Sequence, residues 1–277
     1  MIHSQGLSAL VRLSDAIKSG LLLGASMTTP IIAAYKQNEP KYNEIARLGK
    51  LLGEPGADVA KIESKLTSVN ESIPQETKAM AAEMLFHLHG QAMSVILLSC
   101  FCLESYINNM AFFLFKEKDY LGLIKDGHAS TADILVDAII KMSVRQKWEK
   151  VCCLDNEAAF DRSRPPVQDF GYLFNFRDDV VHDKVLAFGE DRAKKRYNNR
   201  LPDPVLSQLS LKHAQYAARV YRDMVKYLHQ FVGVEQCDFQ KHYNLSPWRS
   251  PEDEKRIDAL VLEYSKCGLD FTLSSLG

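Results

Sequence analysis

Apolar residues recur at helical spacing along most of the chain, and no stretch alternates between apolar and polar positions as a half-buried strand would. The first such pattern covers residues 7–24, with Leu10 and Ile17 on broadly one side. The segment Thr28-Thr29-Pro30 follows it. Because proline disfavours helical geometry in the residue before it, we expect the first helix to end there. The pattern predicts an all-α protein.

Polar segments with proline or glycine divide the rest of the chain. The clearest breaks are Gly-Glu-Pro-Gly at 53–56, the stretch at 161–166 with two prolines, and the polar segment at 183–205. The pattern at 77–117 is the longest, and it fits either one helix or two helices joined near residues 87–90. Further helices are expected at residues 41–53, 57–69, 77–117, 167–182, 206–232 and 251–266.

The polar segment at 70–76 contains a proline and is a candidate boundary. A chain of 277 residues suits one large domain or two modest ones. We therefore expect an N-terminal helical accessory region at 1–74, a helical bundle at 75–236 and a C-terminal extension at 237–277. The alternative is that the N-terminal helices pack into the same core as the bundle.

Charge and cysteine usage narrow the function classes. The formal net charge is -1, so binding to a polyanion requires a local basic patch. The six cysteines form no C-x-x-C pair, and no cysteine–histidine set has zinc-site spacing, so neither a metal nor a cofactor is expected. The sequence MIHSQGLSALVRLSD does not resemble a secretory signal. These features predict a cytoplasmic location.

The apolar stretch at 95–115 is long enough to suggest a membrane span. Glu104, Asn108 and Asn109 lie near its middle, where a carboxylate would be costly in lipid. We therefore expect a buried helix of a soluble protein and no membrane contact.

The octet Phe-Arg-Asp-Asp-Val-Val-His-Asp at 176–183 holds the strongest candidate for chemistry. Arg177 and His182 are five positions apart, which separates them by about 140° around a helix. They converge if the helix ends or bends near His182, or if two copies of the helix meet. The simpler interpretation is that His182 is a helix C-terminal residue, stabilised there by the helix dipole.

The segment from Arg177 to His182 resembles the Arg-x4-6-His motif of the HEPN superfamily, in which a polar residue such as Asp178 follows the arginine. Residues 102–113, CLESYINNMAFF, are similar to an early helix of bacterial HEPN proteins. The resemblance covers about residues 77–235. It implies a HEPN-like antiparallel bundle with an additional N-terminal helical segment. It also implies a homodimer with a composite site.

The activity implied by the resemblance is a metal-independent endoribonuclease, acting as a toxin or phage-defence effector, with Arg177 and His182 as catalytic residues. The N-terminal region would then sense a trigger or bind an inhibitor. Two alternatives stay open. One is a non-catalytic HEPN-like bundle that binds RNA, a nucleotide or a partner protein. The other is a helical scaffold in which the motif is coincidental.

Supporting roles follow from position. Glu104 and Asn108 share a helix face within an apolar run. A buried carboxylate needs a partner, so Glu104 either aims Arg177 or pairs elsewhere in the bundle. Asp178 either orients His182 or faces water.

The segment after the motif has an excess of basic residues and is either an RNA-binding patch or ordinary solvated surface. The candidates are Lys184, Arg192, Lys194, Lys195 and Arg196. Lys184 also occupies a position where several HEPN toxins carry a tyrosine.

Overall fold

The structure is a computed structural model, and it describes residues 2–117, 141–153, 160–181, 209–230 and 246–267. Within these ranges every regular element is a helix, which confirms the all-α prediction. The helices are α1 (Ile2–Gln37), α2 (Glu39–Leu52), α3 (Val59–Glu71), α4 (Gln75–Glu117), α7 (Val144–Cys153), α8 (Val167–Val181), α10 (Leu211–His229) and α12 (Pro251–Lys266).

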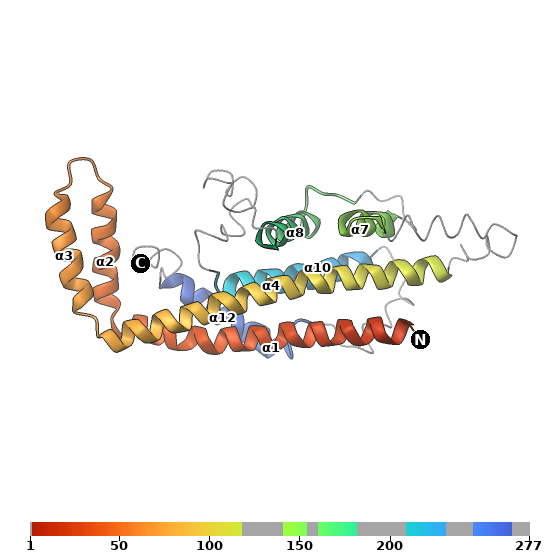
Figure 1. Cartoon of the computed structure of the whole chain (residues 1–277), viewed down its shortest axis with the longest axis horizontal. Coiled ribbons are helices and arrows are strands. Elements are labelled where there is room, and N and C mark those ends of the chain that lie inside the picture. Colours follow the sequence, from red (N-terminus) through yellow and green to blue (C-terminus); the bar gives the residue numbers. More distant parts are fainter. Residues whose placement is uncertain (1, 118–140, 154–159, 182–208, 231–245, 268–277) are drawn as a thin grey trace, which may run out of the picture.

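The two longest of these helices, α1 and α4, lie side by side and run in opposite directions (Figure 1). The long pattern at 77–117 is therefore one helix. Leu10, Ile17 and Leu21 of α1 are almost completely buried, as are Leu88 and Val95 of α4, and all five belong to one hydrophobic core. The α1–α4 pair forms one layer of the molecule, on which α7, α8, α10 and α12 pack.

The expectation that the first helix ends at Pro30 is wrong, because α1 continues through this proline to Gln37. Proline removes one backbone hydrogen bond and costs about 3 kcal/mol inside a helix. Beyond it, however, Ile31 and Ile32 are 2% and 5% exposed. Burying each side chain contributes about 1.5–3 kcal/mol. Tertiary packing therefore outweighs the local preference of proline.

The α2–α3 hairpin projects from the end of the α1–α4 pair (Figure 1). Only Ile45 and Leu48 of α2 are buried, and α3 has no buried residue. The Asp58 carboxylate accepts a hydrogen bond from the Lys61 backbone N–H and so caps α3. The first 74 residues thus divide into α1, which is part of the core, and a hairpin outside it.

Above α4, α7 and α8 are seen nearly end-on, so they cross it, while α10 packs along α4 (Figure 1). Trp148 of α7 is fully buried and stacks on Tyr106 of α4, with ring centroids 6.1 Å apart. At the C-terminal end, α12 is tied to α1 by a Lys36–Glu263 ion pair. The described part of residues 237–277 therefore packs against the core.

Two described helices, α1 and α4, have segments long and apolar enough to span a membrane, Ala9–Gln37 and Gln75–Ala111. In the most apolar window of each, 50% and 44% of the residues are buried within the protein. Core helices of soluble proteins also meet these criteria, so the segments alone are weak evidence for a membrane location.

Candidate functional site

Helix α8 carries Arg177 to the surface beside α4. Phe170, Leu173 and Phe176 are almost completely buried and fix the inner face of α8. Arg177 follows this apolar face, and its side chain is 24% exposed. The expected helix at 167–182 agrees with the described helix, which covers Val167–Val181.

Three groups hold the Arg177 guanidinium. Nη1 donates a hydrogen bond to Asp178 Oδ1 at 3.0 Å, and Nη2 lies 4.0 Å from Glu104 Oε2. The guanidinium carbon also lies 5.9 Å from the centre of the Phe101 ring, within the range of a cation–π contact. Among the described residues, the buried Nε has no acceptor. The guanidinium is therefore oriented by side chains but has an N–H group left unpaired by them.

The structure brings Glu104 and Arg177 together, as one of the two sequence interpretations expected. The separation of 4.0 Å is that of a long ion pair rather than a hydrogen bond. The expectation that Glu104 is buried is wrong, because its side chain is 39% exposed. Position 104 lies at the edge where α8 crosses α4, whereas its neighbours Leu103 and Tyr106 are buried in the core.

Asn108 has a different partner from Glu104. Its Oδ1 accepts a hydrogen bond from Lys147 Nζ of α7 at 2.8 Å. Arg145, also on α7, donates from Nη2 to the Gly171 carbonyl at 2.9 Å and to Asn175 Oδ1 at 2.6 Å, both on α8. Lys147 and Arg145 could not be identified from the sequence, because their partners depend on how α7 crosses α4 and α8.

The other half of the motif lies outside the described residues. This applies to His182 and to the basic residues expected to bind RNA, namely Lys184, Arg192, Lys194, Lys195 and Arg196. Asp178 pairs with Arg177, and the structure does not describe its relation to His182.

The charged side chains around Arg177 carry a net negative charge. One guanidinium faces two carboxylates, those of Glu104 and Asp178, all of them partly exposed. Ion pairs at such positions contribute about 0–1 kcal/mol each. The guanidinium can therefore exchange one carboxylate for a phosphate at modest cost, but this cluster alone does not attract anions.

Two histidines bind the N-terminus of α10, and sequence reasoning missed this role. The backbone N–H of Leu209 donates to His89 Nδ1 at 2.9 Å, and that of Ser210 donates to His213 Nδ1 at 3.0 Å. Burial and the positive charge of Lys212 lower the pKa of His213 to about 3, and burial also lowers the pKa of His89. Both imidazoles are therefore neutral acceptors near pH 7.

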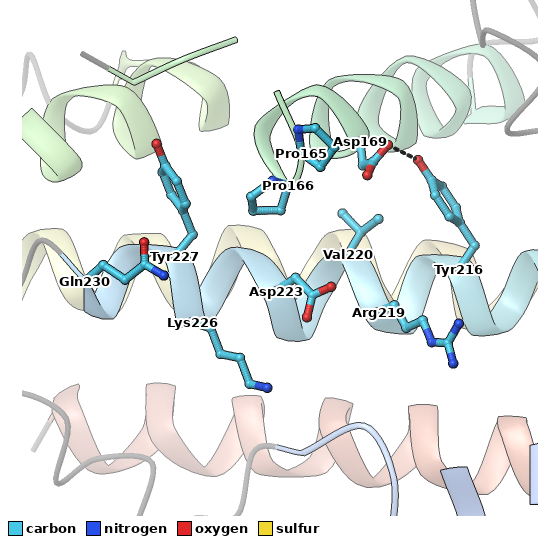
Figure 2. Close-up of a pocket in the computed structure, with 10 residues that line it drawn as sticks. All are labelled: Pro165, Pro166, Asp169, Tyr216, Arg219, Val220, Asp223, Lys226, Tyr227 and Gln230. Carbon is cyan, nitrogen blue, oxygen red and sulfur yellow. Dashed lines mark hydrogen bonds between the residues drawn. The ribbon is translucent and has the colours of Figure 1, made fainter. Parts of the chain in front are cut away.

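A groove of about 450 Å³ lies between α10 and the start of α8 (Figure 2). Tyr216 and Tyr227 stand toward opposite ends of the view, and the Tyr216 hydroxyl donates to Asp169 Oδ1 at 3.0 Å. Arg219, which also lines the groove, pairs with Asp258 of α12. Neither Arg177 nor its partners line this groove, so it is separate from the candidate site.

Neither metal nor thiol chemistry is indicated in the described part of the chain. No group of three or more His, Cys, Asp or Glu residues there is placed to hold a metal ion. Burial raises the pKa of the Cys100 thiol, and it raises that of Cys102 to about 12. At neutral pH both residues are uncharged thiols, which are poor nucleophiles.

In comparisons with known proteins, no family model, curated protein or solved structure matches the chain. The residues around Arg177 and the resemblance of their sequence to the HEPN motif are therefore what points to a function.

Proposed function

We propose that the protein is a metal-independent endoribonuclease of the HEPN type, acting in the cytoplasm as a toxin or phage-defence effector. The observation that supports this most is the orientation of Arg177 at a partly exposed position by Glu104 and Asp178. This arginine begins the motif that ends at His182.

In the proposed reaction, the ribose 2′-hydroxyl attacks the adjacent phosphorus and His182 accepts the hydroxyl proton. A histidine with a pKa near 6.5 suits this transfer near neutral pH. The Arg177 guanidinium binds two oxygens of the phosphorane as negative charge develops on them. The bond to the 5′-oxygen breaks, and that oxygen takes a proton. The products end in a 2′,3′-cyclic phosphate and a 5′-hydroxyl.

The proposal includes a homodimer in which each copy contributes to a shared site. Residues five apart diverge by about 140° on one helix, so Arg177 and His182 of one copy would not point at the same phosphate. In a homodimer, the motif of the second copy approaches that phosphate from the other side. The projecting α2–α3 hairpin is the part of residues 1–74 best exposed to an inhibitor or a sensor partner.

A cleavage assay tests this function. Wild-type protein, His182→Ala and Arg177→Ala are incubated with mixed RNA in EDTA, and the RNA ends are identified. We expect cleavage by the wild type and a loss of about 10²–10⁴-fold in His182→Ala, because a general base contributes about that much. Arg47→Ala is the matched control, since the partner of Arg47 among the described residues is Glu44, on the surface of the same helix α2.

Equal cleavage by wild type and His182→Ala, or none by either, would reject the nuclease. The alternative function is a non-catalytic bundle that binds RNA, a nucleotide or a partner protein. The observation that favours it over catalysis is the pairing of Arg177 with two carboxylates, which leaves a net negative charge around the motif arginine. A gel shift with RNA but no cleavage would support this alternative.

A further inference from the structure

We propose that Lys147, held by Asn108, is a second phosphate-binding position beside Arg177, so that an RNA strand is bound across both α8 and α7. This inference rests on the proposed function, which supplies a polyanionic substrate. It assigns Asn108 as the positioning residue for a second cation rather than for Arg177.

Two polar side chains on one face of α4 contact the helices that cross it. Glu104 and Asn108 are four residues apart, so they lie on one face with a rise of about 6 Å between them. Glu104 lies beside Arg177 of α8, and Asn108 contacts Lys147 of α7. The two contact positions on α4 are therefore about one helical turn apart, and each is occupied by a cation from a different helix, Arg177 of α8 or Lys147 of α7.

The charge balance shows why a second cation matters. Arg177, Glu104 and Asp178 together carry one positive and two negative charges, a sum that disfavours a phosphate. The partner of Lys147 is an amide oxygen, which orients the ammonium without neutralising it. No described carboxylate pairs with Lys147. Adding Lys147 brings the sum of these charges to zero. Arg145, which lies on the same helix and is hydrogen-bonded to α8, adds a further positive charge.

Lys147 is also well placed mechanically. Its neighbour Trp148 is fully buried against Tyr106, which fixes this turn of α7 on α4. Arg145 ties the same helix to α8 through Gly171 and Asn175. An ammonium has three donors, and the contact with Asn108 uses one of them. Two N–H groups of the Lys147 ammonium therefore remain for phosphate oxygens. The helix that carries Lys147 is held by contacts with both α4 and α8.

The test measures binding separately from cleavage. A labelled single-stranded oligouridylate is titrated with the His182→Ala protein in EDTA, from about 50 to about 200 mM KCl, by fluorescence anisotropy. Lys147→Ala is then added to this background. Lys61→Ala, which removes an exposed lysine from the remote helix α3, is the matched control.

We expect Lys147→Ala to weaken binding about tenfold, the size of a charge-assisted hydrogen bond. The slope of log affinity against log salt should fall by about 0.7, the value for one phosphate contact with a single strand. Lys147→Arg should retain the slope. Asn108→Leu should weaken binding less than Lys147→Ala, because the ammonium remains but loses its orientation. Thermal melting of each variant confirms that the fold is intact.

The outcomes separate this inference from the nuclease function. If Lys147→Ala binds like Lys61→Ala while the wild type cleaves RNA, the second phosphate position is rejected and the function stands. If Lys147→Ala lowers binding and slope but the wild type never cleaves, the position stands and the nuclease is rejected. If the His182→Ala protein does not retain RNA at all, the inference is rejected.

Discussion

At the scale of single residues, Gly20 sets how closely α1 and α4 approach. A Cβ at this position would lie 2.6 Å from Val95 Cγ2 and 2.9 Å from Gln91 Nε2. The glutamine amide ends a flexible side chain and can move, but the branched valine is restricted to few rotamers. Gly90 of α4 is different, because a Cβ there would meet no atom within 4 Å.

The two glycines give opposite predictions for the same substitution. Gly90→Ala should raise the free energy of unfolding by about 0.5–1 kcal/mol, because alanine loses less backbone entropy in a helix. Gly20→Ala gains the same propensity but overpacks the core, which costs about 1–3 kcal/mol. Urea unfolding of the two variants measures the difference. Equal stabilisation by both would show that α1 shifts away from α4 without cost.

The contacts of Arg177 show how far sequence reasoning reaches at this scale. Glu104 could be named as a partner because a carboxylate in an apolar run needs one. The pairing of Asn108 with Lys147 could not be anticipated, since the two residues are 39 positions apart and meet only where α7 crosses α4. Phe101, which lies under the guanidinium, was likewise hidden within an apolar pattern.

At the scale of elements, the N-terminus of α10 depends on two neutral imidazoles. A protonated imidazole has no lone pair for the backbone N–H groups of Leu209 and Ser210. The folded-state pKa of His213 is about 3, below its ordinary value of 6.5, so the unfolded chain takes up the proton first as the pH falls. The stabilisation by this histidine is complete above pH 6.5 and is lost as the pH falls toward 3.

His213→Gln should therefore reduce the acid sensitivity of the fold. Glutamine at the third helical position can accept the same backbone hydrogen bond and does not titrate. Between pH 7 and 5, the wild type should lose up to about 1.4 kcal/mol per pH unit more than the variant. Denaturant unfolding at several pH values tests this. Parallel curves for the two proteins would mean that His213 contributes nothing to acid unfolding.

The limits of each helix could be predicted where glycine and proline lie between helices, as at 53–56 and 161–166. The prediction failed at Pro30, because this proline lies inside α1 rather than between helices. The residues after it, Ile31 and Ile32, are buried in the core. Local rules describe the preference of one residue, whereas burial of the residues beyond it decides whether the helix continues.

At the scale of the whole molecule, the α1–α4 layer and the α2–α3 hairpin contribute differently to stability. Helix α1 supplies many residues to the central core. The hairpin buries only Ile45 and Leu48 along its two helices. The sequence indicated a boundary near residue 74 but could not show that the core would include α1 and exclude the hairpin.

Replacing residues 41–70 with a short Gly/Ser linker should therefore leave a cooperatively folded protein. The C-terminal end of α1 and the N-terminal end of α4 are close together, so closing a flexible loop between them costs little entropy. Removing residues 1–37 should abolish the cooperative thermal transition, because it bares the apolar face of α4. Circular dichroism melting of the two proteins measures both effects. Loss of the transition on hairpin replacement would assign the hairpin a structural role.

The contact between α1 and α12 has a consequence for biosynthesis. Lys36 and Glu263 are 227 positions apart, yet their ion pair joins α1 to α12 at the surface. At about 5–20 residues per second, a ribosome needs about 10–50 s to make the intervening chain. During that interval α12 does not yet cover its part of the apolar face of α1. A nascent or truncated chain therefore exposes apolar surface to which chaperones bind. A translational pause anywhere after α4 would prolong that vulnerable period.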